Sequence, residues 1–157
     1  MEQSTPQRNI TYRRVRRSRA KDLLIEKLTK KGDARFGEIW RLLIFAACLG
    51  LQKNAREPLG DYDTGKSIDF SYFGGCQSWP GFLYLLNLVE AGDASVLNHD
   101  QEMLEKQILC FEEYANGGLS FIQNELEVRD YCLDAFVSLL PNEPITVMKM
   151  EDLSTQI

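Results

Sequence analysis

The chain has 157 residues, the usual length of one domain, and its 44% hydrophobic and 26% charged residues exclude a disordered, collagen-like or coiled-coil protein. Its longest apolar run, residues 42–51, spans ten residues, whereas a membrane span needs about 20. The first residues are polar where a signal peptide would be apolar. We therefore expect a cytoplasmic protein with no membrane segment.

Charge is divided unevenly along the chain. Residues 1–56 carry 14 Lys and Arg against five acidic residues, and residues 57–157 carry four against 18. Such a split is typical of a contact with an anionic polymer. We predict that the densest basic stretch contacts DNA phosphates through Arg13, Arg14, Arg16, Arg17, Arg19 and Lys21. The alternatives are a solvated arm, or an arm that docks on the acidic half of the same chain or of a second copy.

The N-terminal part is predicted to begin with a flexible segment over residues 1–11, because it is polar with little apolar content. Residues 12–17 lack a helical apolar pattern and are expected to be extended. Ser18 is a suitable N-cap for a helix over residues 19–31, which Gly32 would end.

A second helix is predicted over residues 34–53, with Asp33 as its cap. Apolar residues surround it almost completely, which is typical of a helix in the centre of a core, and Gly50 would permit close helix packing. Residues 58–81 are irregular and rich in Gly and Pro. Within them, residues 66–73 contain an alternation of apolar and polar side chains that predicts a short strand.

Three more helices are expected in the acidic part. One runs over residues 80–91, one over residues 100–116 until Gly117-Gly118 end it, and one over residues 119–140 with a break near Arg129. Helical spacing places several side chains inward, among them Phe82, Leu85, Leu86, Val89, Leu133, Phe136, Val137 and Leu140.

Together these elements predict a mainly α fold. We expect a single compact helical domain of about five helices over residues 12–140, with the short strand segment and a basic N-terminal arm. Its basic part would be residues 12–56 and its acidic part residues 57–140, followed by a flexible tail over residues 141–157.

Residues 60–67 match the pattern G-x-x-x-x-G-K-[ST] of a phosphate-binding loop. That loop requires a buried strand before it and a helix after it. Residues 54–59 are too polar for such a strand, and residues 68–73 alternate like a strand instead of beginning a helix. Asp61 and Asp63 would also repel a triphosphate. We therefore interpret the segment as a glycine-rich surface turn.

The other polar residues form no pattern of catalysis or metal binding. Cys48, Cys76, Cys110 and Cys132 are widely spaced, and His99 is the single histidine, so we expect reduced structural cysteines and no zinc site. The acidic residues fall on the polar faces of predicted helices, which indicates a solvated face. We predict no catalytic residue, no metal and no cofactor.

Two binding interpretations stay open. The acidic helices could dock a basic surface of a partner protein, with Glu112 and Glu113 as the candidate residues. The first 55 residues also resemble the ribbon-helix-helix plan, in which the strands of two chains pair and enter the major groove. We favour the simpler interpretation of two core helices with a basic arm, and the sequence leaves open whether the chain forms a homo-oligomer.

A recognisable pattern is formed by residues 36–51, 56–59 and 108–119, together with the basic opening at residues 13–17. These segments resemble the bacterial DNA phosphorothioation-associated protein 4 family, also called the dnd system-associated protein 4 family. The resemblance covers roughly residues 12–127. It supplies no catalytic residue that could be carried over to this chain.

The resemblance implies a setting. The family accompanies systems that put sulfur into the DNA backbone, and the linked restriction machinery that defends against phage. We therefore expect a non-enzymatic accessory of such an antiphage system that contacts DNA through its basic arm. The alternative is an adaptor that docks a restriction or modification subunit through its acidic helices, and a nucleotide-binding or nuclease enzyme is a remote alternative.

Overall fold

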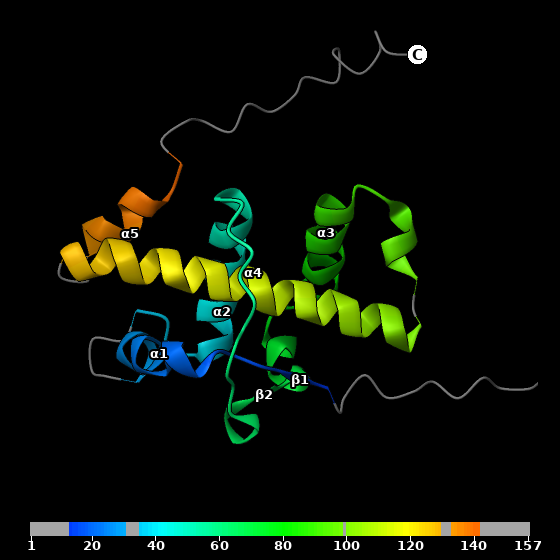
Figure 1. Ribbon diagram of the computed structural model, residues 1–157, viewed down its shortest axis with the longest axis horizontal. Coiled ribbons are helices and arrows are strands. Elements are labelled where there is room, and N and C mark those ends of the chain that lie inside the picture. Colours follow the sequence, from blue (N-terminus) through cyan, green and yellow to red (C-terminus); the bar gives the residue numbers. More distant parts are fainter. Residues whose placement is uncertain (1–12, 31–34, 99, 130–132, 142–157) are drawn as a thin grey trace, which may run out of the picture.

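The computed structural model describes residues 13–30, 35–98, 100–129 and 133–141 (Figure 1). Within them lie β1 (Arg14–Val15), α1 (Asp22–Thr29), α2 (Ile39–Gln52), β2 (Ile68–Asp69), α3 (Trp79–Ala91), α4 (Gln101–Val128) and α5 (Leu133–Leu139). Short 3-10 turns join them: η2 (Arg19–Lys21), η3 (Thr64–Lys66), η4 (Phe70–Gly75) and η5 (Ala94–Leu97). The prediction of a mainly α fold with a short strand segment is confirmed.

Some predictions fall outside the described residues. These are the flexible segment over residues 1–11, the flexible tail over residues 141–157 except for its first residue, the helix stop at Gly32 and the cap at Asp33. The second helix begins at Ile39, later than predicted, after a bend over residues 35–38. Among the described residues, no helix has the length and apolar character that crossing a membrane requires.

Helix α4 runs along the length of the molecule, and most other elements pack on it (Figure 1). Helices α2, α3 and α5 and the turns η2 and η5 all contact α4, and the most extensive of these contacts is that of α2. The core fills the space between them, with Leu42, Leu43, Phe111, Leu119 and Ile122 almost completely buried.

The prediction that Gly117-Gly118 end a helix is wrong, because α4 continues through both residues to Val128. Packing explains why glycine stands in the middle of a helix, where it costs up to about 1 kcal/mol relative to alanine. A Cβ atom on Gly117 would overlap the carbonyl oxygen of Ala55. The predicted break near Arg129 is confirmed, since α4 ends at Val128.

Glycines on both helices allow α2 and α4 to cross closely. A Cβ atom on Gly118 would overlap the carbonyl oxygen of Ala46 on α2, and one on Gly50 would overlap the carbonyl oxygen of Tyr114 on α4. The prediction that Gly50 permits close helix packing is therefore confirmed. Backbone-to-backbone contact at this crossing brings the two helices nearer than side chains would allow.

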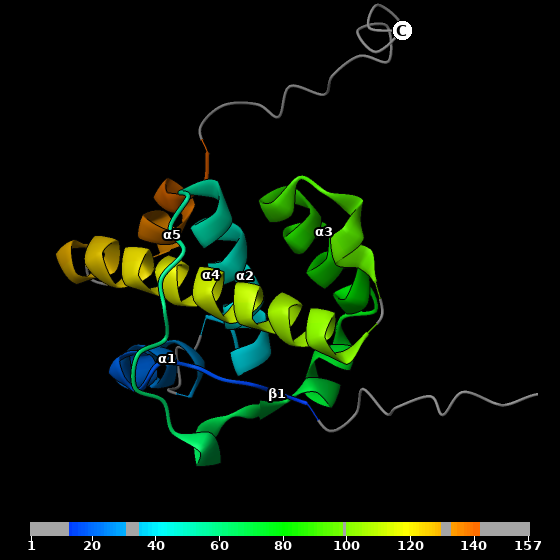
Figure 2. The same ribbon diagram turned by 45° about the vertical axis from the view of Figure 1, so that its right-hand side comes forward.

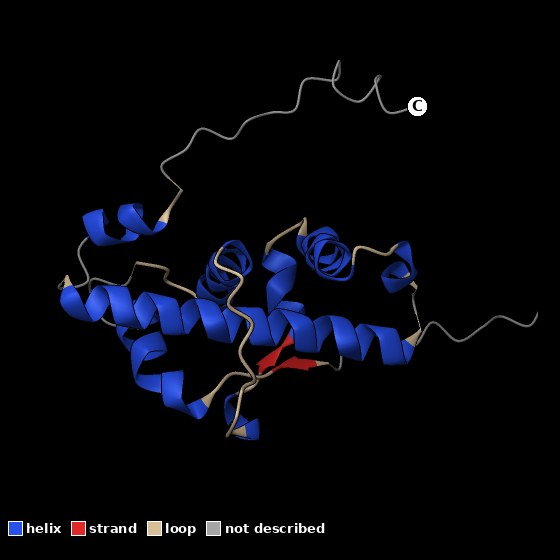
Figure 3. Cartoon of the chain, turned by 45° about the horizontal axis from the view of Figure 1, so that its top comes forward, coloured by secondary structure: helices blue, strands red, loops and turns tan. Residues whose placement is uncertain are grey.

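The short sheet ties the basic N-terminal segment to the middle of the chain. Strand β1 pairs antiparallel with β2, with Arg14 opposite Asp69 and Val15 opposite Ile68 (Figure 3). Because β1 pairs within its own chain, the ribbon-helix-helix interpretation does not hold. The predicted strand over residues 66–73 is shortened, since η4 follows β2 directly.

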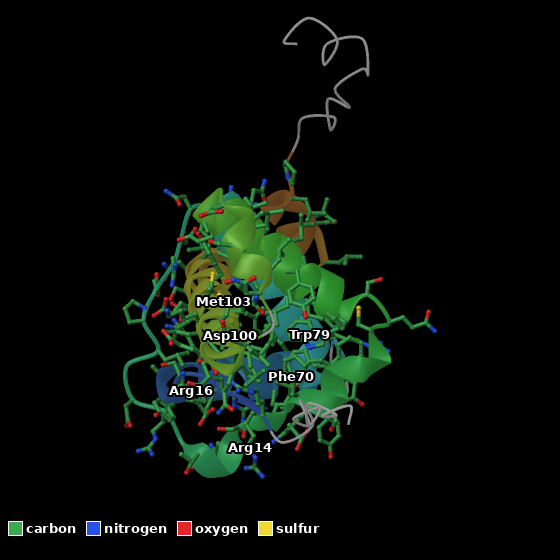
Figure 4. The ribbon with its side chains drawn as sticks, turned by 90° about the vertical axis from the view of Figure 1, so that its right-hand side faces the viewer. Arg14, Arg16, Phe70, Trp79, Asp100 and Met103 are labelled. Carbon is green, nitrogen blue, oxygen red and sulfur yellow. The ribbon has the colours of Figure 1, made fainter. Side chains whose placement is uncertain are left out.

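Turn η4 carries aromatic side chains into the core. The ring of Phe70 lies 5.4 Å from that of Trp79 (Figure 4), and Phe73 stacks on Trp79 at 4.4 Å. Phe111 of α4 belongs to the same cluster and makes an edge-to-face contact with Trp79 at 4.9 Å between ring centroids. Burial of these rings explains why the alternating pattern gives way to a turn instead of continuing as a strand.

Helical spacing misplaced five apolar side chains. Leu86 and Phe136 are buried as predicted, but the exposed set consists of Leu85, Val89, Leu133, Val137 and Leu140. Both α3 and α5 are apolar on nearly every side, so spacing alone cannot tell which face lies inward. In α3 the inward positions are Trp79, Leu83, Leu86 and Asn87.

The glycine crossing predicts a large effect of one added methyl group. Gly118→Ala should destabilise the protein by about 3 kcal/mol or more, because the new Cβ meets backbone atoms that cannot move aside alone. Gly81→Ala is the matched control, since nothing lies within 4 Å of its added Cβ in α3, and it should be neutral or slightly stabilising. Urea unfolding measures both; equal stability of the two variants would contradict the close crossing.

Candidate functional site

The basic N-terminal segment does not project into solvent; it lies along α4. Arg13 forms an ion pair with Glu105 at 3.4 Å and donates to the carbonyl oxygen of Gln101. Val15, between the arginines, is only 1% exposed. The segment that the charge pattern marks as a DNA-binding arm is thus part of the packed fold.

Arg16 makes the closest contact with α4. Its Nη2 and Nε donate to Glu112 Oε2 at 2.7 and 3.1 Å, and its backbone N–H donates to Glu112 Oε1 at 2.6 Å. The Glu112 side chain is fully buried, and this burial raises its pKa while the hydrogen bonds from Arg16 lower it in part. The pKa of Arg16 is raised, mainly by its hydrogen bonds to Glu112.

The next residue in the sequence, Arg17, is a buried cation. Arg17 is 7% exposed, and its Nε lies 3.3 Å from Asp22 Oδ1. Lys66 donates to the other oxygen of Asp22 at 2.6 Å. Asp22 therefore holds one cation from the basic segment and one from the glycine-rich loop, which joins two distant parts of the sequence.

The other predicted DNA-binding residues lie nearer the surface. Arg19 forms an ion pair with Asp61 at 3.2 Å, and Lys21 donates to Gln123 of α4 at 2.9 Å. Arg14 is exposed on β1, and Figure 4 shows it on the same edge of the molecule as Arg16. Arg14 and Arg19 are thus the most accessible of the predicted residues.

The basic and acidic parts of the sequence form ion pairs with each other within the molecule. Four of the six predicted DNA-binding residues form ion pairs with carboxylates of the same chain, namely Arg13, Arg16, Arg17 and Arg19. This arrangement corresponds to the alternative in which the arm docks on the acidic half of its own chain. It leaves little uncompensated positive charge in the segment.

The two residues predicted to bind a partner protein also have internal roles. Glu112 is buried against Arg16 and cannot reach a partner, so that prediction fails for this residue. Glu113 forms an ion pair with Arg56 at 2.7 Å, and Arg56 also binds Glu90 at 2.7 Å. Tyr114 donates to Glu90, and burial raises the pKa of Tyr114 to about 12.

Two of the segments that carry the family resemblance meet beside Arg56. The backbone N–H of Glu57 donates to the carbonyl oxygen of Glu113 at 3.1 Å. Asn116 donates to the carbonyl oxygen of Pro58 at 2.9 Å, and Ser120 to the carboxylate of Glu57 at 2.6 Å. These contacts hold residues 56–59 on α4.

A groove of about 500 Å³ lies between β1 and the first half of α4. Its lining consists of Arg13, Arg14, Arg16, Glu102, Glu105, Lys106, Ile108, Leu109 and Glu112. Ion pairs join most of its charges, including Lys106 to Glu102 at 2.7 Å. The groove is therefore nearly balanced in charge and does not concentrate positive potential.

The glycine-rich segment over residues 60–67 lacks the geometry of a phosphate-binding loop. It follows an irregular stretch and leads into β2, so no strand precedes it and no helix follows it. Asp63 accepts a hydrogen bond from the backbone N–H of Gly65 at 2.9 Å, which closes a surface turn. Lys66 is engaged with Asp22 and not with an open cradle of N–H groups.

No metal-binding arrangement stands out in the described part of the chain. There, no group of three His, Cys, Asp or Glu side chains could hold a metal ion. Cys48, Cys76 and Cys110 are free thiols, and burial raises the pKa of Cys110 to about 11. Cys132 and His99 lie outside the described residues.

One end of the molecule combines exposed acidic and apolar side chains. We call it the acidic end: Leu85, Val89, Asp93, Leu97, Asp100 and Glu102, from α3, η5 and the start of α4. These three elements contact one another at the right-hand side of Figure 1. Leu85 and Val89 are 59% and 58% exposed, and the carboxylates of Asp93 and Asp100 cap turns while staying accessible.

Sequence reasoning could find the acids of this end but not its apolar part. Helical spacing placed Leu85 and Val89 inward, because α3 is apolar on nearly all sides. The local signal for Asp93 and Asp100 is clearer, since each accepts a backbone N–H at the start of a helical turn. That hydrogen bond is the main reason why the pKa of Asp93 is lowered.

The burial of Glu112 predicts a pH-dependent loss of stability when its cation is removed. Arg16→Ala should cost about 3 kcal/mol, because it leaves Glu112 buried without its cation. The pKa of Glu112 in the folded variant then rises further, so protonation favours folding and the loss should be smaller at pH 5 than at pH 8. Urea unfolding of variant and parent at both pH values gives the difference.

The control for this measurement is Lys106→Ala, which removes an exposed ion pair of the same helix. Exposed pairs contribute little, so this variant should unfold like the parent at both pH values. A similar small effect of Arg16→Ala would show that the Arg16–Glu112 pair does not hold the basic segment.

No curated protein and no solved structure matches this chain. A family model described as DNA sulphur modification system-associated protein 4 matches residues 14–155. The match includes every helix and strand described above and continues beyond residue 141. The chain therefore belongs to the DNA sulphur modification system-associated protein 4 family.

Proposed function

We propose that this protein is a non-catalytic accessory of a DNA sulphur modification system, and that it docks on a basic, partly apolar surface of another protein of that system. The family name supplies the setting, since it associates the chain with such a system. The observation that carries the docking proposal is the acidic end, where carboxylates and large apolar side chains are exposed together.

Charge supports a basic partner. The carboxylates that face the basic segment already form ion pairs with its arginines. Asp93, Asp100 and Glu102 at the acidic end are exposed to solvent. The Glu102 side chain is 80% exposed and forms an ion pair with Lys106 of its own helix. Complementary charge would orient a basic partner and raise the rate of encounter.

Apolar exposure supports a stable contact. Leu85 and Val89 lie one helical turn apart on the outer face of α3, and Leu97 of η5 is also exposed. Exposed apolar side chains rimmed by charged ones are typical of protein interaction sites. The partner surface would therefore place aliphatic or aromatic side chains against α3 and Lys or Arg against the acidic residues.

Contact with DNA is the second candidate. It would rest on Arg14 and Arg19, the most accessible cations of the basic segment. The ion pairs of the neighbouring arginines weigh against it, because a phosphate would have to compete with a carboxylate of the same chain. Docking on a protein is therefore the function that the geometry supports better.

Co-purification from a host that carries the complete system tests the docking proposal. The tagged double variant Leu85→Ser with Glu102→Lys should retain at least tenfold less of the partner than the parent, on the order of 1.4 kcal/mol of binding. Both side chains are exposed, so thermal unfolding should change little. Quantitative mass spectrometry of the retained proteins is the measurement.

The matched control is Leu23→Ser with Glu127→Lys, which makes the same two chemical changes on α1 and at the far end of α4. Leu23 is 82% exposed, so this control should also fold. Equal capture by parent and acidic-end variant, or equal loss in both variants, would refute docking through the acidic end.

A gel shift with duplex DNA at about 50 and about 200 mM salt tests the second candidate. If the basic segment contacts phosphates, Arg14→Ala with Arg19→Ala should weaken binding and reduce the salt slope by about 2. These positions keep the buried Arg16–Glu112 pair intact, so folding is retained. The docking proposal expects parent and variant to behave alike, without salt-sensitive binding.

A further inference from the structure

Helix α5 lies at the end of the molecule opposite to the acidic end (Figure 2). It exposes a row of apolar side chains there. Leu133, Val137 and Leu140 follow one another at helical spacing and are 60%, 56% and 49% exposed. Val128 at the end of α4 is 83% exposed. We call these four residues the α5 face.

The α5 face cannot turn inward, because the other side of the helix is already fixed. Ala135, Phe136 and Leu139 are buried. The Phe136 ring lies 5.9 Å from that of Phe36 and 6.4 Å from that of Phe45 on α2. Rotation of α5 would expose this aromatic cluster, so the outer row needs a separate cover.

The chain itself supplies a segment of suitable chemistry directly after α5. Residues 142–155 contain apolar residues close together, which are Ile145, Val147, Met148, Met150 and Leu153. The family match extends to residue 155, so this segment belongs to the sequence that the family shares and is not an unrelated extension. Because this segment directly follows α5 in the sequence, it is the apolar stretch nearest to the α5 face along the chain.

We propose that residues 142–155 dock on the α5 face of the same chain. Only a few residues separate Leu140 from Ile145, so the segment meets the face at the millimolar effective concentration of a short linker. In an extended conformation, Ile145 and Val147 would point to the same side, toward the face, because they are two positions apart.

This proposal is independent of docking through the acidic end, because the two faces lie at opposite ends of α4 (Figure 1). A second copy of the chain or another protein could cover the same apolar row. The short connection favours the chain's own segment, since it needs no association of separate molecules.

Hydrogen exchange of the full-length chain tests the proposal. Ile145→Asp with Val147→Asp should accelerate exchange of peptides from α5 at least several-fold and increase binding of a hydrophobic dye. Peptides from α2 and the middle of α4 should keep their protection. Ser154→Asp with Thr155→Asp adds the same charge at the polar end of the segment and should leave α5 unchanged.

The reciprocal variant is Val137→Asp, which changes an exposed side chain and should accelerate exchange in peptides from residues 142–155. These effects should not depend on protein concentration, and sedimentation should show the same association state for parent and variants. Unchanged α5 exchange in the Ile145→Asp, Val147→Asp variant overturns the proposal. Protection that increases with concentration also overturns it, in favour of a second copy.

Discussion

The pair formed by the buried Glu112 and the partly exposed Arg16 is the interaction on which the rest of this structure depends. A carboxylate without exposure to water requires a cation and further donors, and Arg16 supplies both from its side chain and its backbone. The pair fixes the basic segment on α4, which in turn places β1 beside β2. The basic stretch that the sequence predicts to be a DNA-binding arm therefore forms contacts within the fold.

Much of the fold could be predicted from the sequence, because helical spacing, caps and stops are local signals. The helix over α2, the turn-rich middle and the break after α4 all follow from such signals. The continuation of α4 through Gly117-Gly118 could not be predicted from the sequence. These glycines are required by close contact with the backbone of α2 and of the segment after it, which lie far away in the sequence. A glycine pair within a helical pattern can either end the helix or allow close packing of another element, and only the tertiary packing decides between the two.

The candidate site was less predictable. Charge density identified Arg13 to Lys21 correctly as a distinct segment, yet a count of charges cannot show which carboxylate each cation meets. Glu112 illustrates the limit, because its neighbours in sequence place it on a polar helix face while a distant arginine allows its burial. The exposed row of α5 and the outer face of α3 were missed for a different reason, since a helix that is apolar on nearly every side gives little indication of which side is exposed.

This member of the DNA sulphur modification system-associated protein 4 family is thus a helical unit in which carboxylates of the same chain pair with four of the six cations of the basic segment, and its exposed acidic end is the docking site that we propose. The most direct measurement is hydrogen exchange at the backbone amide of Arg16, with and without duplex DNA. The account predicts exchange as slow as at Phe111 in the core of α4, unchanged by DNA. Fast exchange of the Arg16 amide, or exchange that accelerates when DNA is added, would contradict it.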